Sequence, residues 1–426
     1  MNEKTAVRTL FRSPSSQSSR PEPRAIKRIA VIAPSAATLL PLRGSLLRAI
    51  AARRHRILCL APDFTAAVLD ELADLGIECA SYPLQQSRLA IGSELKMLRA
   101  LSAALKQWRP HVVLGYGALP AILAPIAAKH AKAETIVAMF SGLDGIVAPT
   151  IDRLDGRRDR QDRQNESQRN RQPKHNKRRR VRNGPGRSLR VQRWRALRSL
   201  DALIVHNDED RRRLESLKLI PSRLPVHVVR GAGVDLDFFT AKPLPAIDGG
   251  LCFLMIAQLR QAKGVMDFCQ TASRIRAGAP TARFVLVGPS DDSAGGVTVD
   301  DLAPHVDDVE FVGAVHDVRP FLEDAHVFVL PSRYGEGMSK TLAEALAAGR
   351  PVITSNLAGC REMVDERVNG CLVAPGDVDA LSAAVRSFLR RPDLIPAMSR
   401  AARAKAERWF DDKDVNRQML QILNID

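Results

Sequence analysis

Short apolar runs alternate with amphipathic helical segments along most of this chain, and this alternation constrains its fold more than any other feature. Ile29–Ala33, Arg56–Ala61 and Ile77–Tyr82 have the length of strands, and helical segments at Leu42–Ala52 and Phe64–Leu75 separate them. Continuous apolar runs of this length are typical of strands buried on both faces, as in parallel sheets whose crossover connections are helices. The pattern therefore predicts an α/β fold built on doubly wound parallel sheets.

The alternation breaks between residues 239 and 250, where proline and glycine cluster before a second series of strands. The strands expected after this break are Cys252–Ala257, Arg283–Gly288, Val309–Val312, His326–Leu330 and Val352–Ser355. A length of 426 residues fits two or three domains of ordinary size. We expect two Rossmann-like domains at 28–240 and 241–410 with a cleft between them, and a helix at 411–426 that returns to the first domain.

The formal net charge of +17 is concentrated in one segment. Residues 151–199 hold 18 Lys and Arg against 5 Asp and Glu, and Arg153–Arg190 has almost no apolar side chains. Such a composition cannot bury a core, so we predict a disordered basic low-complexity insert at 151–192. Two interpretations stay open, a solvated surface insertion and a polybasic patch for anionic lipid headgroups. Nucleic acid is the least favoured partner, because Trp194 is the single aromatic residue of the segment and base stacking needs several.

The amino terminus and the cysteines predict a cytoplasmic protein. Residues 1–27 are polar and lack the apolar stretch of a signal peptide, so we expect a disordered leader. The six cysteines are scattered without close pairs, which is typical of reduced thiols. No run approaches the ~18 apolar residues of a transmembrane helix. If the basic insert binds lipid, the protein would be peripheral at the inner face of the plasma membrane.

The most informative motif lies between Pro331 and Ile353, where a strand, a glycine-rich loop and a helix follow one another. The loop carries Glu336, and the helix that opens near Ser339 carries Glu344 eight positions after it. Ligands of open α/β sheets bind at the carboxyl ends of strands, where loops lead into helix N-termini. Free amides there suit a diphosphate, and ionised carboxylates suit sugar hydroxyls because each accepts several O–H hydrogen bonds. The segment therefore predicts a nucleotide-sugar site.

Further segments match one family pattern together with this motif. They are Ile256–Leu259, Lys263–Val265, Phe284–Gly288, Gly359–Glu362, Asn369–Gly370 and Leu372–Pro375 in the second half, and Leu42–Gly44, Arg109–Val113 and Arg230–Asp235 in the first. In combination they resemble retaining glycosyltransferases of family 4, and most of all the subgroup that builds bacterial surface polysaccharides and lipid-linked glycans. The resemblance implies the GT-B fold of two facing Rossmann-like domains. It covers nearly the whole chain outside the leader and the insert.

The resemblance also implies a role for each charged residue of the donor site. Glu336 would contact the hydroxyls of the donor sugar, and Glu344 those of the ribose. Lys263 would neutralise the diphosphate leaving group, whose charge grows as the glycosidic bond breaks. No metal ion is expected where a lysine and helix amides replace one, and no cofactor beyond the nucleotide-sugar co-substrate. The remaining donor-binding positions are Arg260, Gln258, Gly335, Gly337, Met338, Ser339, Val315 and Arg361.

Some positions depart from the family pattern or allow an alternative. The family has arginine where this chain has Gln258, and Arg260 two residues later is the expected substitute. The family also has a basic or histidine residue just past the strand at 112–114, which this chain lacks. Arg361 forms either a donor contact or a salt bridge with Glu362 at the start of a helix. The residues expected on the acceptor side are Arg43, Gly142 and Asp144.

The resemblance implies a retaining transferase that moves a hexose or N-acetylhexosamine from a nucleotide sugar to a glycan or lipid-linked acceptor. The expected donor is a UDP-sugar, and the expected process is surface polysaccharide biosynthesis. Two alternatives stay open. One is a nucleotide-sugar epimerase on the same fold, which would need paired acids and histidine in the cleft. The other is a catalytically weak protein that binds a sugar nucleotide or nucleic acid, because Gln258 replaces a diphosphate cation.

Overall fold

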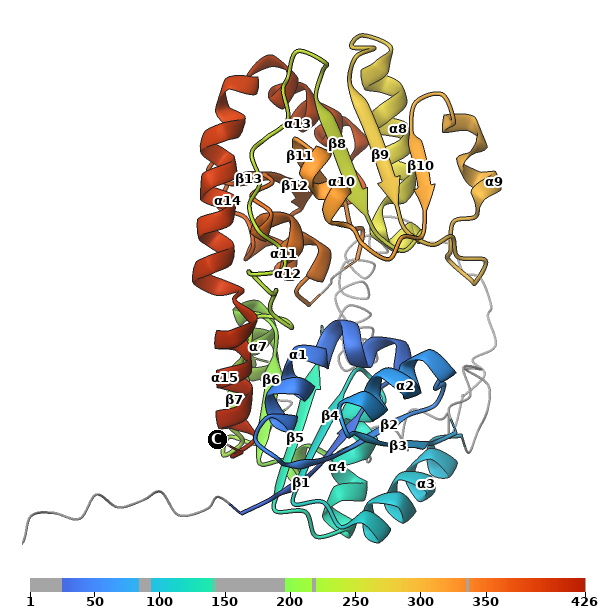
Figure 1. Ribbon diagram of the computed structural model, residues 1–426, viewed down its shortest axis with the longest axis vertical. Helices are drawn as coiled ribbons and strands as arrows, with labels where there is room; N and C mark the ends of the chain where they lie inside the picture. Colours follow the sequence, from blue (N-terminus) through green and yellow to red (C-terminus); the bar gives the residue numbers. More distant parts are fainter. Residues whose placement is uncertain are drawn as a thin grey trace, which may run out of the picture.

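The computed structural model describes residues 25–83, 93–140, 142, 196–216, 220–334 and 337–425. They form two α/β domains, one above the other in Figure 1, and each has its own parallel sheet. The expected fold class of two facing Rossmann-like domains is confirmed. Residues 1–24 of the expected leader and the whole basic insert lie outside the described residues.

Seven parallel strands form the sheet of the first domain, in the order β3-β2-β1-β4-β5-β6-β7. Their bounds are β1 Arg28–Ile32, β2 Arg56–Ala61, β3 Glu78–Ser81, β4 Val112–Tyr116, β5 Thr135–Phe140, β6 Ala202–Val205 and β7 Val226–Val228. The central strands β1, β4, β5 and β6 are buried over nearly their whole length. Burial on both faces explains why their sequences are continuous apolar runs rather than alternating ones.

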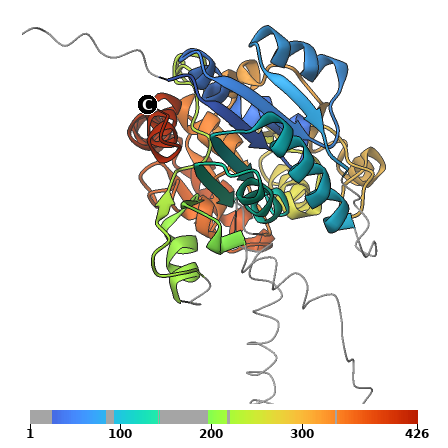
Figure 2. The ribbon, with the colours of Figure 1, turned by 90° about the horizontal axis from the view of Figure 1, so that it is seen from below.

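Helices cover both faces of this sheet, as the view from below shows (Figure 2). The helices of the first domain are α1 Leu39–Ala51, α2 Ala66–Asp74, α3 Ser93–Trp108, α4 Pro120–His130 and α7 Asp208–Ser216. Helices α3 and α4 pack on one face, while α1 and α2 pack on the other. Asn207 caps the start of α7, because the Asp210 amide donates to Asn207 Oδ1 at 2.7 Å.

The second domain contains six parallel strands in the order β10-β9-β8-β11-β12-β13. Their bounds are β8 Cys252–Ile256, β9 Arg283–Val287, β10 Glu310–Gly313, β11 Val327–Leu330, β12 Val352–Ser355 and β13 Gly370–Val373. The helices are α8 Val265–Arg276, α9 Val299–Leu302, α10 Arg319–Asp324, α11 Lys340–Ala347, α12 Ala358–Arg361, α13 Val378–Arg390 and α14 Ile395–Trp409. Strand β13 is additional to the strands that the sequence predicts. It is a four-residue edge strand that begins with glycine, so it carries little strand signal.

The chain crosses between the domains twice, and the two crossings lie side by side. The Val234 amide donates to Phe410 O at 2.7 Å, and the Asp412 amide donates to Val234 O at 3.1 Å. Gly233 has a φ of 72°, and a Cβ at this position would lie 2.5 Å from the Cα of Asp412, so only glycine fits. After the second crossing, α15 (Asp412–Ile422) continues below α14 in Figure 1 and packs against α1 of the first domain.

None of the helices in the described part of the chain is long and apolar enough to span a bilayer.

Candidate functional site

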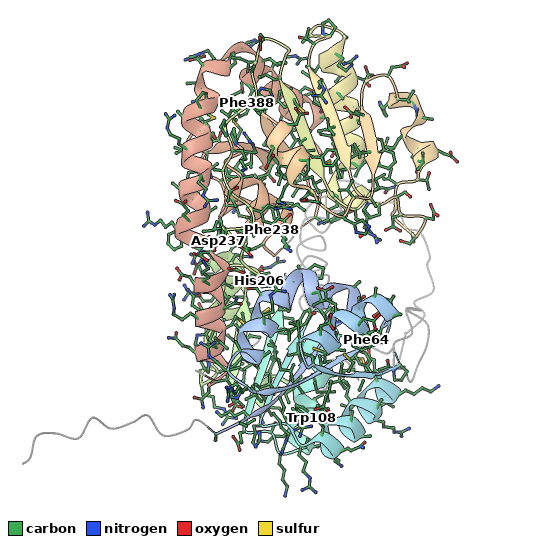
Figure 3. The ribbon with its side chains drawn as sticks, viewed as in Figure 1. Phe64, Trp108, His206, Asp237, Phe238 and Phe388 are labelled. Carbon is green, nitrogen blue, oxygen red and sulfur yellow. The ribbon has the colours of Figure 1, made fainter. Side chains whose placement is uncertain are left out.

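A cavity of about 420 Å³ lies between the two domains. The first domain contributes the start of α1, and the second contributes the loop before α10 together with α11. The interdomain connection and the first residue of α15 complete its wall. Phe238 of this connection lies at the junction of the domains in Figure 3. The charged and titratable residues that line the cavity are Arg48, Asp235, His316, Asp317, Lys340, Glu344 and Asp412.

Glu344 is the acidic residue of α11 at this cavity. The helix begins where Ser339 caps it, because the Leu342 amide donates to Ser339 Oγ at 3.4 Å. Glu344 is only 7% exposed. Burial raises the pKa of its carboxyl, and the charge of Lys340 opposes this rise. Lys340 Nζ lies 3.5 Å from Glu344 Oε1. A buried carboxylate with a cation beside it can remain ionised and accept hydrogen bonds from hydroxyl groups.

The loop between β11 and α11 ends against the interdomain connection. Gly337 is buried and Met338 is half-buried. A Cβ at Gly231 would lie 3.0 Å from the Cβ of Met338, so this part of the loop packs closely on the connection. Gly335 and Glu336 lie outside the described residues, and their roles remain predictions.

Lys263 lies in a 3-10 turn, Gln261–Lys263, that packs against the start of the same loop. The Arg333 amide donates to the carbonyl of Ala262 at 2.8 Å. A Cβ at Gly264 would come within 2.0 Å of Pro331 O, and Gly264 has a φ of 74°, which favours glycine. The Arg333 guanidinium also pairs with the buried Asp267 of α8. These contacts hold the turn that carries Lys263 against the segment that leads to Glu336.

Gln258 and Arg260, expected near the diphosphate, both contact Asp291. Gln258 Nε2 donates to Asp291 Oδ2 at 3.1 Å, and Arg260 Nη1 lies 2.8 Å from the same oxygen. Hydrogen bonds from Ser293, and to a smaller extent the Arg260 charge, hold the pKa of Asp291 below its usual value. Arg260 Nη2 donates in addition to Ala294 O. The charge of Arg260 is thus largely compensated by a carboxylate, which weakens it as a substitute for the missing family arginine.

Arg361 contacts the first domain. Its Nη1 atom lies 2.7 Å from Oε2 of Glu209 on α7, and its Nη2 atom donates to Asn356 O. Glu362 also reaches α7, where its Oε1 atom accepts a hydrogen bond from the Asp208 amide at 2.7 Å. Instead of the local salt bridge considered from the sequence, both residues link the second domain to the first.

Arg43, expected on the acceptor side, is buried and does not lie at an open surface. Arg43 is 4% exposed, and its Nη1 and Nη2 atoms donate to Leu42 O at 3.0 Å and Met139 Sδ at 2.6 Å. Its guanidinium lies 5.2 Å from the centre of the Tyr116 ring. Gly142 is half-buried just after β5, and Asp144 lies outside the described residues. Arg43 is therefore held at the carboxyl ends of β4 and β5 rather than in the cavity.

Two features near the domain junction were not expected from the sequence. Lys340 contacts both domains, although its spacing of four residues from Glu344 is a recognisable helix ion-pair signal. His206, at the domain junction in Figure 3, is buried, and burial and the nearby Arg43 lower its pKa to about 4. Val315, expected among the donor-binding residues, is half-buried against the core of the second domain and precedes the cavity residue His316.

Residues 251–391 match the family model described as glycosyl transferases group 1. The chain is 29% identical over 219 residues to the putative colanic acid biosynthesis glycosyltransferase WcaL of Salmonella typhimurium, a match that covers 50% of this chain and 53% of WcaL. It is 28% identical over 176 residues to a Campylobacter jejuni protein, N,N'-diacetylbacillosaminyl-diphospho-undecaprenol alpha-1,3-N-acetylgalactosaminyltransferase, covering 41% of this chain and 45% of that one. The chain spans about half the length of the curated relatives that it matches.

The fold is shared with solved structures. Anabaena Alr3699/HepE in complex with UDP-glucose superimposes with a TM-score of 0.67 over 93% of this chain and 99% of that one. The sequence identity is 15%, so this likeness concerns the fold alone. The family match confirms the expected resemblance to glycosyltransferases. The shared fold confirms the expected GT-B architecture.

Proposed function

We propose that this chain, whose second domain is a glycosyl transferases group 1 domain, is a retaining glycosyltransferase. It transfers a hexose or N-acetylhexosamine from a UDP-sugar to a glycan or lipid-linked acceptor of surface polysaccharide biosynthesis. One observation carries the proposal: Glu344, a buried acid on α11, lines a cavity between two Rossmann-like domains with Lys340 beside it. Ribose hydroxyls are the partners that such a carboxylate accepts best.

Each charged residue has a separate role in the proposed reaction. Glu344 holds the ribose, and Lys263 neutralises the diphosphate, whose negative charge grows as the bond to the sugar breaks. A fixed cation therefore stabilises the transition state more than the ground state. Glu336 holds the hydroxyls of the donor sugar. The leaving phosphate takes the proton of the acceptor hydroxyl, so retention needs no separate base.

The names of related proteins support the donor and acceptor classes. The Anabaena structure contains UDP-glucose. The Campylobacter jejuni relative is named for an N-acetylgalactosaminyl group and a diphospho-undecaprenol-linked sugar. WcaL is named for colanic acid biosynthesis.

An amphiphilic acceptor is also compatible with the basic insert, which suits anionic headgroups. Flotation with anionic liposomes should weaken when residues 151–192 are deleted, and unchanged flotation would remove the membrane role.

Turnover tests the proposal. Purified protein is incubated with a panel of UDP-sugars and a lipid-linked acceptor, and UDP release and the anomeric configuration of the product are measured. We expect acceptor-dependent release and a product that retains the donor configuration. Glu336→Ala should lower turnover at least about 100-fold, as the loss of one transition-state contact does elsewhere. The control Glu215→Ala, on the exposed side of α7, should match wild type.

Each negative result of these measurements contradicts a different part of the proposal. Transfer by Glu336→Ala at the wild-type rate would refute the site, and inversion would refute the retaining mechanism. Release of UDP from none of the sugars would refute the donor class. Conversion of one UDP-sugar into another without an acceptor would identify an epimerase instead.

A further inference from the structure

Lys340 contacts both domains through a single ammonium group. Its Nζ atom donates to the carbonyl oxygen of Pro41, in the first turn of α1, at 2.7 Å. The same atom lies 3.5 Å from Oε1 of Glu344, one turn further along α11. We propose that Lys340 is a positioning residue that couples closure of the two domains to the binding of the nucleotide by Glu344. The identity of the ligand in this inference rests on the proposed function.

The surroundings of Glu344 make it dependent on Lys340. The carboxyl is almost completely buried, and burial favours its protonated form. Among the described residues, Lys340 is the cation within ion-pair distance of it. The other charged and titratable groups that face the cavity come from α1, the interdomain connection, the loop before α10 and α15. They are Arg48, Asp235, His316, Asp317 and Asp412.

Three of these five groups are acids, so they do not supply the positive charge that keeps Glu344 ionised. Arg48 lines the cavity from α1, and no ion pair is found between it and Glu344. The ionisation of Glu344 therefore depends chiefly on Lys340.

The ammonium group of Lys340 has three N–H donors, so it makes its two contacts at the same time. Pro41 O takes the shorter contact, and the distance to Glu344 is long for an ion pair. The carboxylate then keeps lone pairs for two hydroxyl groups while the nearby charge keeps it ionised. When the domains separate, the Pro41 carbonyl moves away and the ammonium loses the contact that holds it beside Glu344. Without a fixed cation beside it the buried Glu344 carboxyl takes up a proton more readily, so closure and nucleotide binding favour each other.

The close packing beside Lys340 makes the contact sensitive to domain position. Met338, two residues before it, packs tightly against Gly231 of the interdomain connection, where an added Cβ would lie 3.0 Å from the Cβ of Met338. A small rotation of one domain at this point changes the distance from α11 to α1. A change in the relative position of the domains therefore changes the contact of Lys340 with Pro41 and, through it, the surroundings of Glu344.

The test compares Lys340→Met and Lys340→Arg with wild type and with Lys413→Met. Lys413 also forms an ion pair, with Asp237 at 2.7 Å, but lies outside the cavity lining. UDP affinity is measured by calorimetry between pH 5.5 and 8.5, and domain closure on UDP addition is followed by small-angle X-ray scattering. Melting temperatures confirm that each variant is folded.

We expect Lys340→Met to weaken UDP binding about tenfold at pH 7.5, as for loss of an ion-paired partner, and to reduce closure. The pH at which binding is lost on acidification should move upward, because Glu344 takes up a proton more readily without the neighbouring charge. Lys340→Arg should restore both properties to within about threefold, and Lys413→Met should behave as wild type. In a Glu344→Gln background, Lys340→Met should no longer shift the pH dependence.

Unchanged affinity, closure and pH dependence in Lys340→Met would overturn the inference. A Lys340→Arg protein as impaired as Lys340→Met would also overturn it, because a packing role and not the charge would then explain the loss. If wild type itself binds no UDP, the donor class of the proposed function fails, which is a different result from equal binding by wild type and variant.

Discussion

Arg361 on α12 and Glu209 on α7 form an ion pair of 2.7 Å that joins the second domain to the first. Beside it, the amide of Asp208 donates to Glu362, so the first turn of α7 is tied to α12 twice. The charge of Arg361 is therefore paired with a carboxylate of the other domain. This position accounts for its absence from the lining of the cavity that contains Glu344.

Charge exchange distinguishes an interdomain role of Arg361 from a donor-binding role. Glu209→Arg should lower kcat/KM about threefold to tenfold by repelling Arg361, while the melting temperature changes by only about 1–3 °C, because exposed pairs contribute little stability. Adding Arg361→Glu should restore activity, since the pair is re-formed with opposite polarity. Persistent loss in the exchanged protein would assign Arg361 to the donor.

Lys263 provides the test of diphosphate neutralisation. Lys263→Met should reduce kcat about 100- to 1000-fold, the range seen when one transition-state contact is removed, with a smaller change in the affinity for UDP. Lys413→Met, which removes an exposed lysine outside the cavity, is the matched control. Steady-state kinetics with the preferred UDP-sugar measures both. A kcat within threefold of wild type for Lys263→Met would contradict the assignment.

Gly264 holds the turn of Lys263 in place through its backbone. Gly264→Ala introduces a Cβ at a φ of 74° and 2.0 Å from Pro331 O, so the turn or the loop must move. We expect a loss of about 2–4 kcal/mol in the free energy of unfolding of the second domain, together with a fall in kcat. Gly278→Ala is the control, because no atom lies within 4 Å of the added methyl group there. Equal stability of the two variants in urea would refute the strain at Gly264.

His206 makes stability depend on pH. Its folded-state pKa is about 4, below the ordinary 6.5, because burial and Arg43 disfavour the charged ring. The unfolded chain therefore binds more protons between these pH values, and its protonation destabilises the fold as pH falls below about 6.5. The contribution lost on going to pH 4 is about 3 kcal/mol. Urea titrations of wild type and His206→Asn should show a flatter pH dependence for the variant, and parallel curves would contradict the prediction.

The alternation of strands and helices was sufficient to predict both sheets, because strands buried on two faces leave continuous apolar runs. Strand β13 was not predicted from the sequence. It is a four-residue edge strand that begins with glycine and pairs on one side only, so its sequence resembles a turn. Glu344 was predicted from the motif around it, because loop–helix junctions after strands have recognisable glycine, proline and cap positions. Lys263 was predicted from the resemblance to family 4.

The contacts between the domains had no such local signal. Glu209 is 152 residues before Arg361, and Pro41 is 299 residues before Lys340. Which residues meet across the cleft depends on how the two domains are oriented, and that orientation is fixed by the paired crossings at Val234 and Asp412. A sequence pattern gives the fold of each domain but not this angle. The burial of the Arg43 side chain of α1 could not be predicted either, because its partners Tyr116 and Met139 come from two separate strands.

The central claim is that the cavity beside Glu344 is the nucleotide site, and calorimetric titration of UDP into wild type and Glu344→Gln tests it most directly. The substitution keeps the size of the side chain but removes its negative charge. That charge would strengthen the hydrogen bonds that the side chain accepts from the ribose hydroxyls. We predict one UDP bound per wild-type chain and at least about tenfold weaker binding by a folded Glu344→Gln protein. Equal affinity of the two proteins would contradict the account.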